Sequence, residues 1–104
     1  MNMMKMMKQA QDLQKSMKKK QAELSKTEVQ FSVGGGMVTA VATCDLKVKS
    51  IKINPDAVDP NDVEMLEDLV LAAVDGVLNT AQDTMSKEMG QLTGSMGLPS
   101  GLGF

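Results

Sequence analysis

Lysine is the residue type whose number and placement in this sequence point to a chemical role. The chain has 11 Lys and no Arg, and seven of the Lys stand in residues 1–26 against Asp12 and Glu23, so this segment carries a net charge of +5. Residues 27–53 carry +1 and residues 54–104 carry −8. The total of −2 therefore hides a basic end that suits either an anionic partner or the acidic end of the same fold.

Most of the usual catalytic side chains are absent. The sequence has no His, no Trp, no Tyr and a single Cys, Cys44. Imidazole acid–base chemistry and His metal ligands are therefore excluded, and a lone thiol makes neither an internal disulfide nor a zinc cluster. We expect no enzyme, no cofactor and no small-molecule substrate, with Cys44 a small buried residue in a reducing compartment; an intermolecular disulfide is the alternative.

Three motifs that resemble binding sites have simpler explanations. The Gly34, Gly35 and Gly36 run lacks the Lys-Ser/Thr ending of a phosphate loop, so a hairpin turn is expected. A cluster of four acidic residues, Asp56, Asp59, Asp62 and Glu64, lacks the alternation and the central Gly of a calcium loop. We expect these residues to cap the start of a helix instead. Glu67 and Asp68 are adjacent in a helix and point in different directions, which does not suit a shared reaction.

The N-terminus does not have the pattern of a signal peptide, because Lys5 interrupts the first Met residues and more Lys follow. The longest apolar run, residues 69–74, is far too short to cross a bilayer. The expectation is a soluble protein in the cytoplasm.

The N-terminal segment predicts a helix over residues 3–24. Apolar residues recur there at heptad a and d spacing: Met3, Met6, Ala10, Leu13, Met17 and Leu24. Lys20 stands where the next d residue belongs, so the apolar seam weakens toward the end of the helix. Lys8, Lys15, Lys18 and Lys19 lie off the seam and stay free to face solvent or a partner.

Three strands follow, over residues 27–33, 37–43 and 46–53, as their β-branched content and alternation indicate. Cys44 and Asp45 make the second turn. The third strand changes phase between Val48 and Ile51, so a β-bulge is expected near Lys49 and Ser50. The sequence predicts an antiparallel meander.

A second, long helix comes next. Asp59 is predicted to cap it, with Pro60 at its first position, and the apolar spacing sustains about 30 residues. The Gly-rich stretch from residue 91 to 104 is expected to be a flexible tail behind a domain of residues 1–90. The fold class is therefore α+β, in the order α-β-β-β-α. Because the helices are longer than the sheet and leave apolar stripes uncovered, an intertwined homodimer is expected.

Four segments in this order are similar to the YbaB/EbfC family of bacterial nucleoid-associated proteins. They are residues 8–11 (KQAQ), 34–38 (GGGMV), 51–55 (IKINP) and 64–73 (EMLEDLVLAA), of which the last is the most specific. The resemblance spans about residues 3–90 and extends to the Gly-Leu-Pro of the tail. It implies a homodimer whose helices grip double-stranded DNA like tweezers, a cytoplasmic, nucleoid location, effects on DNA shape and gene expression, and no catalysis.

The sequence departs from the family pattern at several points. It has no Arg, an acidic total charge, and Asp75-Gly76-Val77 where many relatives resemble Asn-Asp-Ala or Asn-Glu-Ala. Without Arg we expect Lys contacts to the phosphate backbone, weak sequence preference and strong salt dependence.

By their chemistry alone, the lysines of the first two thirds of the chain are the candidate DNA-binding residues. The main candidates are Lys5, Lys8, Lys15, Lys18, Lys19, Lys20 and Lys26, and the secondary candidates on the sheet are Lys47, Lys49 and Lys52. Two other functions stay open: a protein–protein adaptor that uses the Met-rich first helix, and a helix on a membrane surface, which the lack of aromatic anchors opposes.

Overall fold

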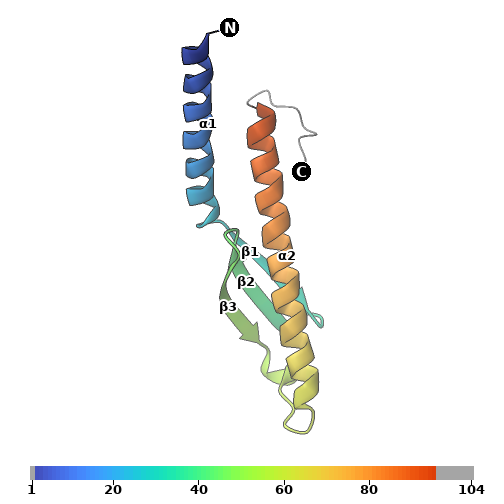
Figure 1. The fold of residues 1–104 in the computed structure, drawn as a ribbon. Coiled ribbons are helices and arrows are strands. Elements are labelled where there is room, and N and C mark those ends of the chain that lie inside the picture. Colours follow the sequence, from blue (N-terminus) through green and yellow to red (C-terminus); the bar gives the residue numbers. More distant parts are fainter. Residues whose placement is uncertain (1, 96–104) are drawn as a thin grey trace.

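The computed structural model describes residues 2–95 and has the predicted α+β architecture (Figure 1). The elements in chain order are α1 (Met3–Leu24), β1 (Glu28–Val33), β2 (Val38–Thr43), β3 (Lys47–Ile53), the short 3₁₀ helix η1 (Pro55–Ala57) and α2 (Val63–Ser95). The strands form one antiparallel meander in the order β1-β2-β3, with α2 packed on one face. Within residues 2–95, neither helix combines the length and apolar content that a membrane span needs.

The sheet follows its predicted turns and register closely. Gly34, Gly35 and Gly36 have φ angles of 62°, 68° and 93°, the left-handed region in which Gly has no steric penalty, and they connect β1 to β2. The predicted bulge is confirmed at Lys49, because Val41 pairs with Ser50 and Ala42 pairs with Val48. Each strand begins within one residue of its predicted start.

The core lies between β2 and α2 and consists of small side chains. Val38, Ala40 and Ala42 lie on one face of β2 and are fully buried against Ala73 and Val77 of α2. Small residues on both elements let the helix axis approach the sheet closely. Among the described residues, the largest fully buried side chains are those of Val38, Val77 and Cys44, so a single chain buries little apolar volume.

Gly76 lies in the interior of α2 and leaves space for the aromatic ring of Phe31. A Cβ atom at Gly76 would lie 2.3 Å from two ring carbons of Phe31 on β1. The ring therefore packs against bare helix backbone. No residue larger than Gly fits there while Phe31 keeps its place.

The substitution Gly76→Ala is expected to lower the free energy of unfolding by about 1–2 kcal/mol. It displaces Phe31, and overpacking outweighs the gain of about 1 kcal/mol in helix propensity. Urea unfolding measures the change. Gly90→Ala is the matched control, since a Cβ there meets nothing within 4 Å, and it should be neutral or stabilising. Equal effects of the two substitutions would contradict this packing.

The predicted start of α2 is wrong by about three residues. Asp59 does not cap the helix, because its carboxylate accepts from the amide of Asn61 at 2.9 Å and closes a separate turn. Asp62 is the capping residue: its Oδ1 accepts from the amide of Met65 at 3.2 Å, and the helix begins at Val63. Asp59 and Asp62 both have a side chain suited to the N-cap position, and Asp62 is the one that occupies it.

The predicted end of α2 also differs. The helix continues to Ser95, five residues past the predicted domain limit at residue 90, so residues 91–95 are helical rather than part of a tail. Residues 96–104 lie outside the described part of the chain.

The C-terminal end of α1 is anchored to the sheet by the β2–β3 turn. Leu24 is buried, and the amide of Cys44 donates to the carbonyl oxygens of Leu24 at 3.1 Å and of Thr27 at 2.9 Å. The turn itself is tight: Leu46 has a φ of 67°, and the Thr43 hydroxyl donates to the Asp45 carboxylate. Helix α1 therefore leaves the sheet from a fixed point.

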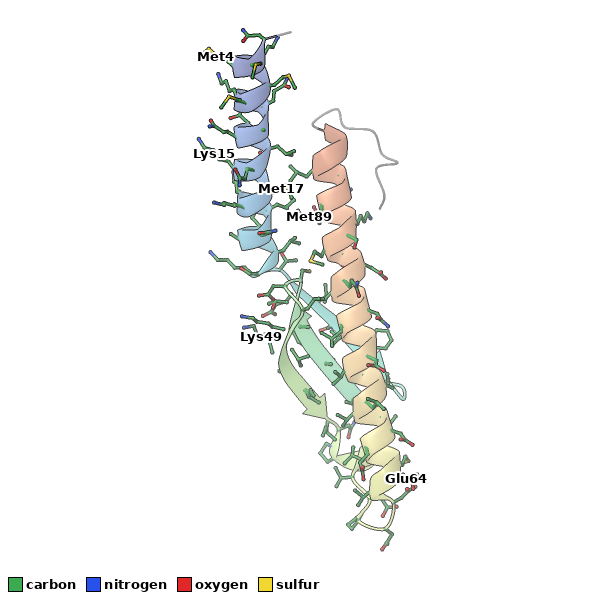
Figure 2. All side chains as sticks on the ribbon, in the orientation of Figure 1. Met4, Lys15, Met17, Lys49, Glu64 and Met89 are labelled. Carbon is green, nitrogen blue, oxygen red and sulfur yellow. The ribbon has the colours of Figure 1, made fainter. Side chains whose placement is uncertain are left out.

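The rest of α1 runs beside α2 and then projects beyond the sheet (Figure 1). Half-buried residues at helical spacing face α2, and Figure 2 shows Met17 of α1 and Met89 of α2 in the space between the helices. Residues 2–12 are exposed throughout. The predicted seam is thus covered in its second half, by α2 of the same chain, and bare in its first half.

One ion pair joins the two helices at the middle of this contact. Lys20 Nζ lies 3.1 Å from a carboxylate oxygen of Glu88 and 3.6 Å from one of Glu23. The pKa of Lys20 is raised, chiefly by the hydrogen bond to Glu88 and the attraction of that carboxylate. Lys20, the polar residue on the apolar seam of α1, therefore pairs with Glu88 of α2.

Replacing Glu88 with Gln should lower the melting temperature at 20 mM salt and have little effect at 500 mM, since salt screens a pair that is partly exposed. Thermal unfolding at both salt concentrations measures this. The charge-swapped double variant K20E/E88K should recover part of the low-salt loss, because it restores the pair between the helices but places a carboxylate next to Glu23. A loss that is independent of salt would show that the packing of Glu88, rather than its charge, supports α1.

The molecule is long and narrow. Its principal extents are 71 × 24 × 16 Å and its radius of gyration is 19.4 Å, whereas a compact domain of this length has a radius of about 13 Å. The projecting part of α1 and the ends of α2 account for the difference (Figure 1).

Candidate nucleic-acid interface

Five lysines form one face of α1, which we call the basic face: Lys5, Lys8, Lys15, Lys18 and Lys19. All five are exposed. At about 100° per residue their centre lies about 160° around the helix from Leu13, Met17 and Leu24, which face the rest of the fold. Figure 2 shows Lys15 on the side of α1 that points away from α2. The basic face is therefore open to a partner along the whole helix.

The two remaining main candidates differ from these five. Lys20 is half-buried and held by Glu23 and Glu88, so its charge is directed toward α2. Lys26 is exposed and lies just past the end of α1. Within residues 2–95, no lysine other than Lys20 forms an ion pair. The basic face is thus not neutralised by contacts within the chain.

The secondary candidates lie apart from the basic face, on β3. Lys47 and Lys52 pair with Thr43 and Thr39 on the sheet face opposite α2, and Lys49 occupies the bulge. The pKa of Asp45 is lowered, first by the Thr43 hydroxyl and then by Lys47 and Lys49. That carboxylate offsets part of the positive charge at this end of β3.

Three of the six acidic residues of α2 lie on a side of the helix that does not oppose the basic face directly. Glu64, Asp68 and Asp75 share one side of the helix, about 180° from the buried Ala73 and Val77. They therefore point away from the sheet into solvent. These three carboxylates are thus separate from the basic face, whereas Asp12 lies within it, one turn after Lys8, and Glu88 meets Lys20.

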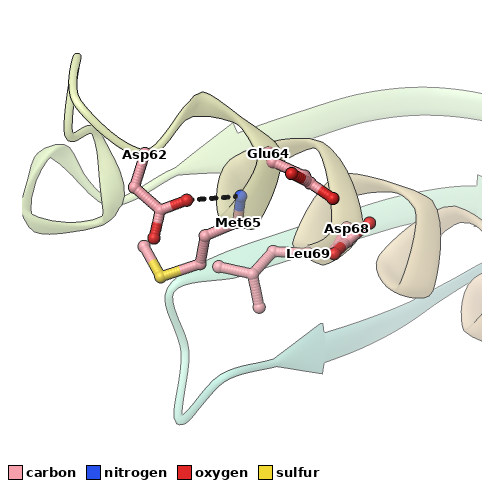
Figure 3. A pocket seen from close by; sticks show the side chains of 5 residues that line it. All are labelled: Asp62, Glu64, Met65, Asp68 and Leu69. Carbon is pink, nitrogen blue, oxygen red and sulfur yellow. Dashed lines mark hydrogen bonds between the residues drawn. The ribbon is translucent and has the colours of Figure 1, made fainter.

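A shallow hollow at the start of α2 is lined by Asp62, Glu64, Met65, Asp68 and Leu69 (Figure 3). The carboxylate of Asp62 is turned to the amide of Met65, as a cap requires. Among the described residues, no group of three or more His, Cys, Asp or Glu side chains is arranged to hold a metal ion. Helix capping therefore accounts for the position of Asp62.

An apolar groove lies between β3 and α2. Its lining is Ile53, Leu66, Glu67, Val70, Leu71 and Val74. Next to it Val48 and Ile51, each 39% exposed, share a sheet face with the buried residues of β2. Leu71 is 61% exposed. This strip of uncovered apolar surface continues directly from the core.

Cys44 is fully buried at the root of α1, as expected for a structural residue. Burial raises the pKa of its thiol, and the carboxylates of Asp45 and Glu88 raise it further. A buried neutral thiol is unreactive and cannot reach a second chain without unfolding of the turn.

Sequence reasoning missed two features of this surface. It did not identify Glu88 as the partner of Lys20, because their proximity depends on how α1 and α2 pack. It also gave no place to Met4, which is 79% exposed and lies on the same side of α1 as Lys15 in Figure 2. The helical position of Met4, four residues before Lys8, was the available signal.

Comparisons with known proteins give consistent results. Residues 1–96 match the YbaB/EbfC DNA-binding family. The chain is 50% identical over 98 residues to a nucleoid-associated protein of Alkaliphilus metalliredigens, covering 94% of this chain and 86% of that protein. It is also 50% identical over 98 residues to one of Pelotomaculum thermopropionicum, covering 94% and 93% of the two chains.

A solved structure has the same fold. The crystal structure of uncharacterized protein HP0035 from Helicobacter pylori superposes with a TM-score of 0.68 at 17% identity, covering 92% of this chain and 97% of that one. At this identity the likeness establishes the fold. With the family match over residues 1–96 and the relatives at 50% identity, the chain belongs to the YbaB/EbfC DNA-binding family.

Proposed function

We propose that this protein is a non-enzymatic, nucleoid-associated protein that binds double-stranded DNA through the basic face of α1. The observation that carries the proposal is that five exposed, unpaired lysines share the side of α1 that points away from the acidic helix. Membership of a DNA-binding family and the names of the relatives support the nucleoid role.

The chemistry of Lys determines the mode of binding. An ammonium group meets a phosphate as a point charge and lacks the two-pronged geometry with which Arg reads guanine. Contacts from the basic face therefore position the protein on the DNA backbone and carry little sequence information. Lys20 acts at a distance from DNA, since its pair with Glu88 holds α1 in place.

The protein acts as a dimer in this proposal. The core of one chain is thin, and the groove between β3 and α2 with the neighbouring Val48 and Ile51 leaves an apolar strip uncovered. A second copy offers the same apolar strip, so a two-fold contact covers both at once. Pairing doubles the basic faces and places two α1 helices on one assembly, which favours changes in DNA shape and so nucleoid organisation and gene regulation.

The triple variant K8Q/K15Q/K19Q should bind duplex DNA at least about tenfold more weakly at 50 mM salt. Its log–log salt slope should be less steep by about 0.9 for each lost phosphate contact, or about 3 per bound chain. Gel-shift or fluorescence-anisotropy titration at several salt concentrations measures both values.

The matched control is K47Q/K49Q/K52Q, which removes the same charge from β3. It should change the slope and the affinity far less. If the β3 variant loses as much as the α1 variant, the basic face is wrongly assigned. If the wild type shows no binding at 50 mM salt, the adaptor function becomes the better account.

The variant Leu71→Glu should shift the protein from dimer to monomer at micromolar concentration, because it places a charge in the uncovered apolar groove. Sedimentation equilibrium gives the mass, and circular dichroism checks that the helices remain. Val58→Glu is the control, since Val58 is 54% exposed and does not line the groove. A wild type that is monomeric at these concentrations would refute the dimer.

A further inference from the structure

The exposed methionines at the free end of α1 fall into two groups. Met6 is in the helical row of Leu13, Met17 and Leu24, which faces α2, and Met3 lies nearer to that row than to the lysines. Met4, which is 79% exposed, lies on the opposite side, and Met7, which is 60% exposed, lies about 100° from the row, in line with Lys18. Apolar side chains that are this exposed at the end of a projecting helix indicate a contact with a partner outside the chain.

Met4 and Met7 each begin a row of the basic face. Met4 is followed by Lys8 and Lys15 at four and eleven residues, and Met7 by Gln11 and Lys18 at the same intervals. Residues at these intervals lie within about 40° of one another around a helix. Any surface that contacts the lysines of these rows therefore also meets the two thioether side chains.

The charge around these methionines selects an anionic partner. Residues 2–11 contain Lys5 and Lys8 and no acid, and both lysines are exposed. Packing of this end against the same end of a second copy would bring four lysines together, with Asp12, one turn after Lys8 in each helix, as the nearest carboxylate. Double-stranded DNA has phosphates on the outside and stacked bases inside, so it offers contacts to both the lysines and the methionines.

We propose that Met4 and Met7 are wedge residues that insert against the bases of bound DNA and unstack a base step. The inference rests on the proposed DNA binding and adds a mode of action to it. Apolar side chains inserted at a flexible pyrimidine–purine step bend the duplex, while neighbouring positively charged side chains bind the flanking phosphates. The long, unbranched thioether chain reaches past the backbone and adapts its shape to the step.

The test compares two double variants of the full-length protein. M4Q/M7Q removes the wedge, and M3Q/M6Q makes the same chemical change on the same turns of α1 but off the basic face. Each is bound to a 30-base-pair duplex with 2-aminopurine at a central TA step and dyes at its ends. Base fluorescence reports unstacking, energy transfer reports bending, and a salt titration reports the number of phosphate contacts.

We expect the wild type and M3Q/M6Q to raise 2-aminopurine fluorescence and to shorten the end-to-end distance. M4Q/M7Q should lose most of both signals and less than about tenfold in affinity, with an unchanged salt slope because no charge is altered. Circular dichroism and sedimentation confirm that both variants keep their fold and assembly.

Other outcomes overturn the inference in distinguishable ways. If the wild type binds DNA without unstacking, or if M4Q/M7Q behaves like the wild type, the wedge is refuted and the DNA-binding function stands. If both variants lose the signals equally, the assignment to the basic face is refuted. If the wild type does not bind the duplex, the proposed function falls together with the wedge. If M4Q/M7Q alters only binding to vesicles of phosphatidylglycerol and phosphatidylcholine (1:3), a membrane is the partner instead.

Discussion

The anchoring of α1 at its C-terminal end is the constraint on which the proposed DNA-binding surface depends. The amide of Cys44 donates to the carbonyl oxygens of Leu24 and Thr27, and Lys20 pairs with Glu88 one turn earlier in the helix. These contacts fix the rotation of α1 about its own axis. Because the rotation is fixed, the side of α1 that carries unpaired lysines is turned away from α2 for the length of the helix. A loosely attached α1 could turn its lysines toward the carboxylates of α2.

The setting of α2 on the sheet completes this separation of charge. Small residues on β2 and α2 pack closely and leave one orientation of the helix, in which its acidic side faces solvent. The same close packing leaves a thin core and an apolar strip beside β3, the surface on which the proposed dimer depends. A protein with a formal charge of −2 can in this way present a strongly basic surface. Local placement, and not total charge, governs what it attracts.

The sequence predicted the order of the elements, the Gly hairpin and the bulge at Lys49, because each depends on neighbouring residues. It failed where residues of equal propensity compete, as with Asp59 and Asp62 for the cap of α2, and where a contact joins distant segments. The pair of Lys20 with Glu88 is such a contact, because the two residues are 68 positions apart in the chain. The basic side of α1 was evident as a set of lysines off the apolar seam, but its direction relative to α2 required the fold.

Lysine footprinting tests the central claim most directly. The protein is treated with an amine-acetylating reagent with and without duplex DNA at low salt, and mass spectrometry gives the modification rate of each lysine. The account predicts that DNA protects Lys8, Lys15, Lys18 and Lys19, while Lys87 on α2 is unaffected and Lys20 is slow to react in both conditions. Protection of Lys47, Lys49 and Lys52 with none on α1, or equal protection throughout the chain, would contradict it.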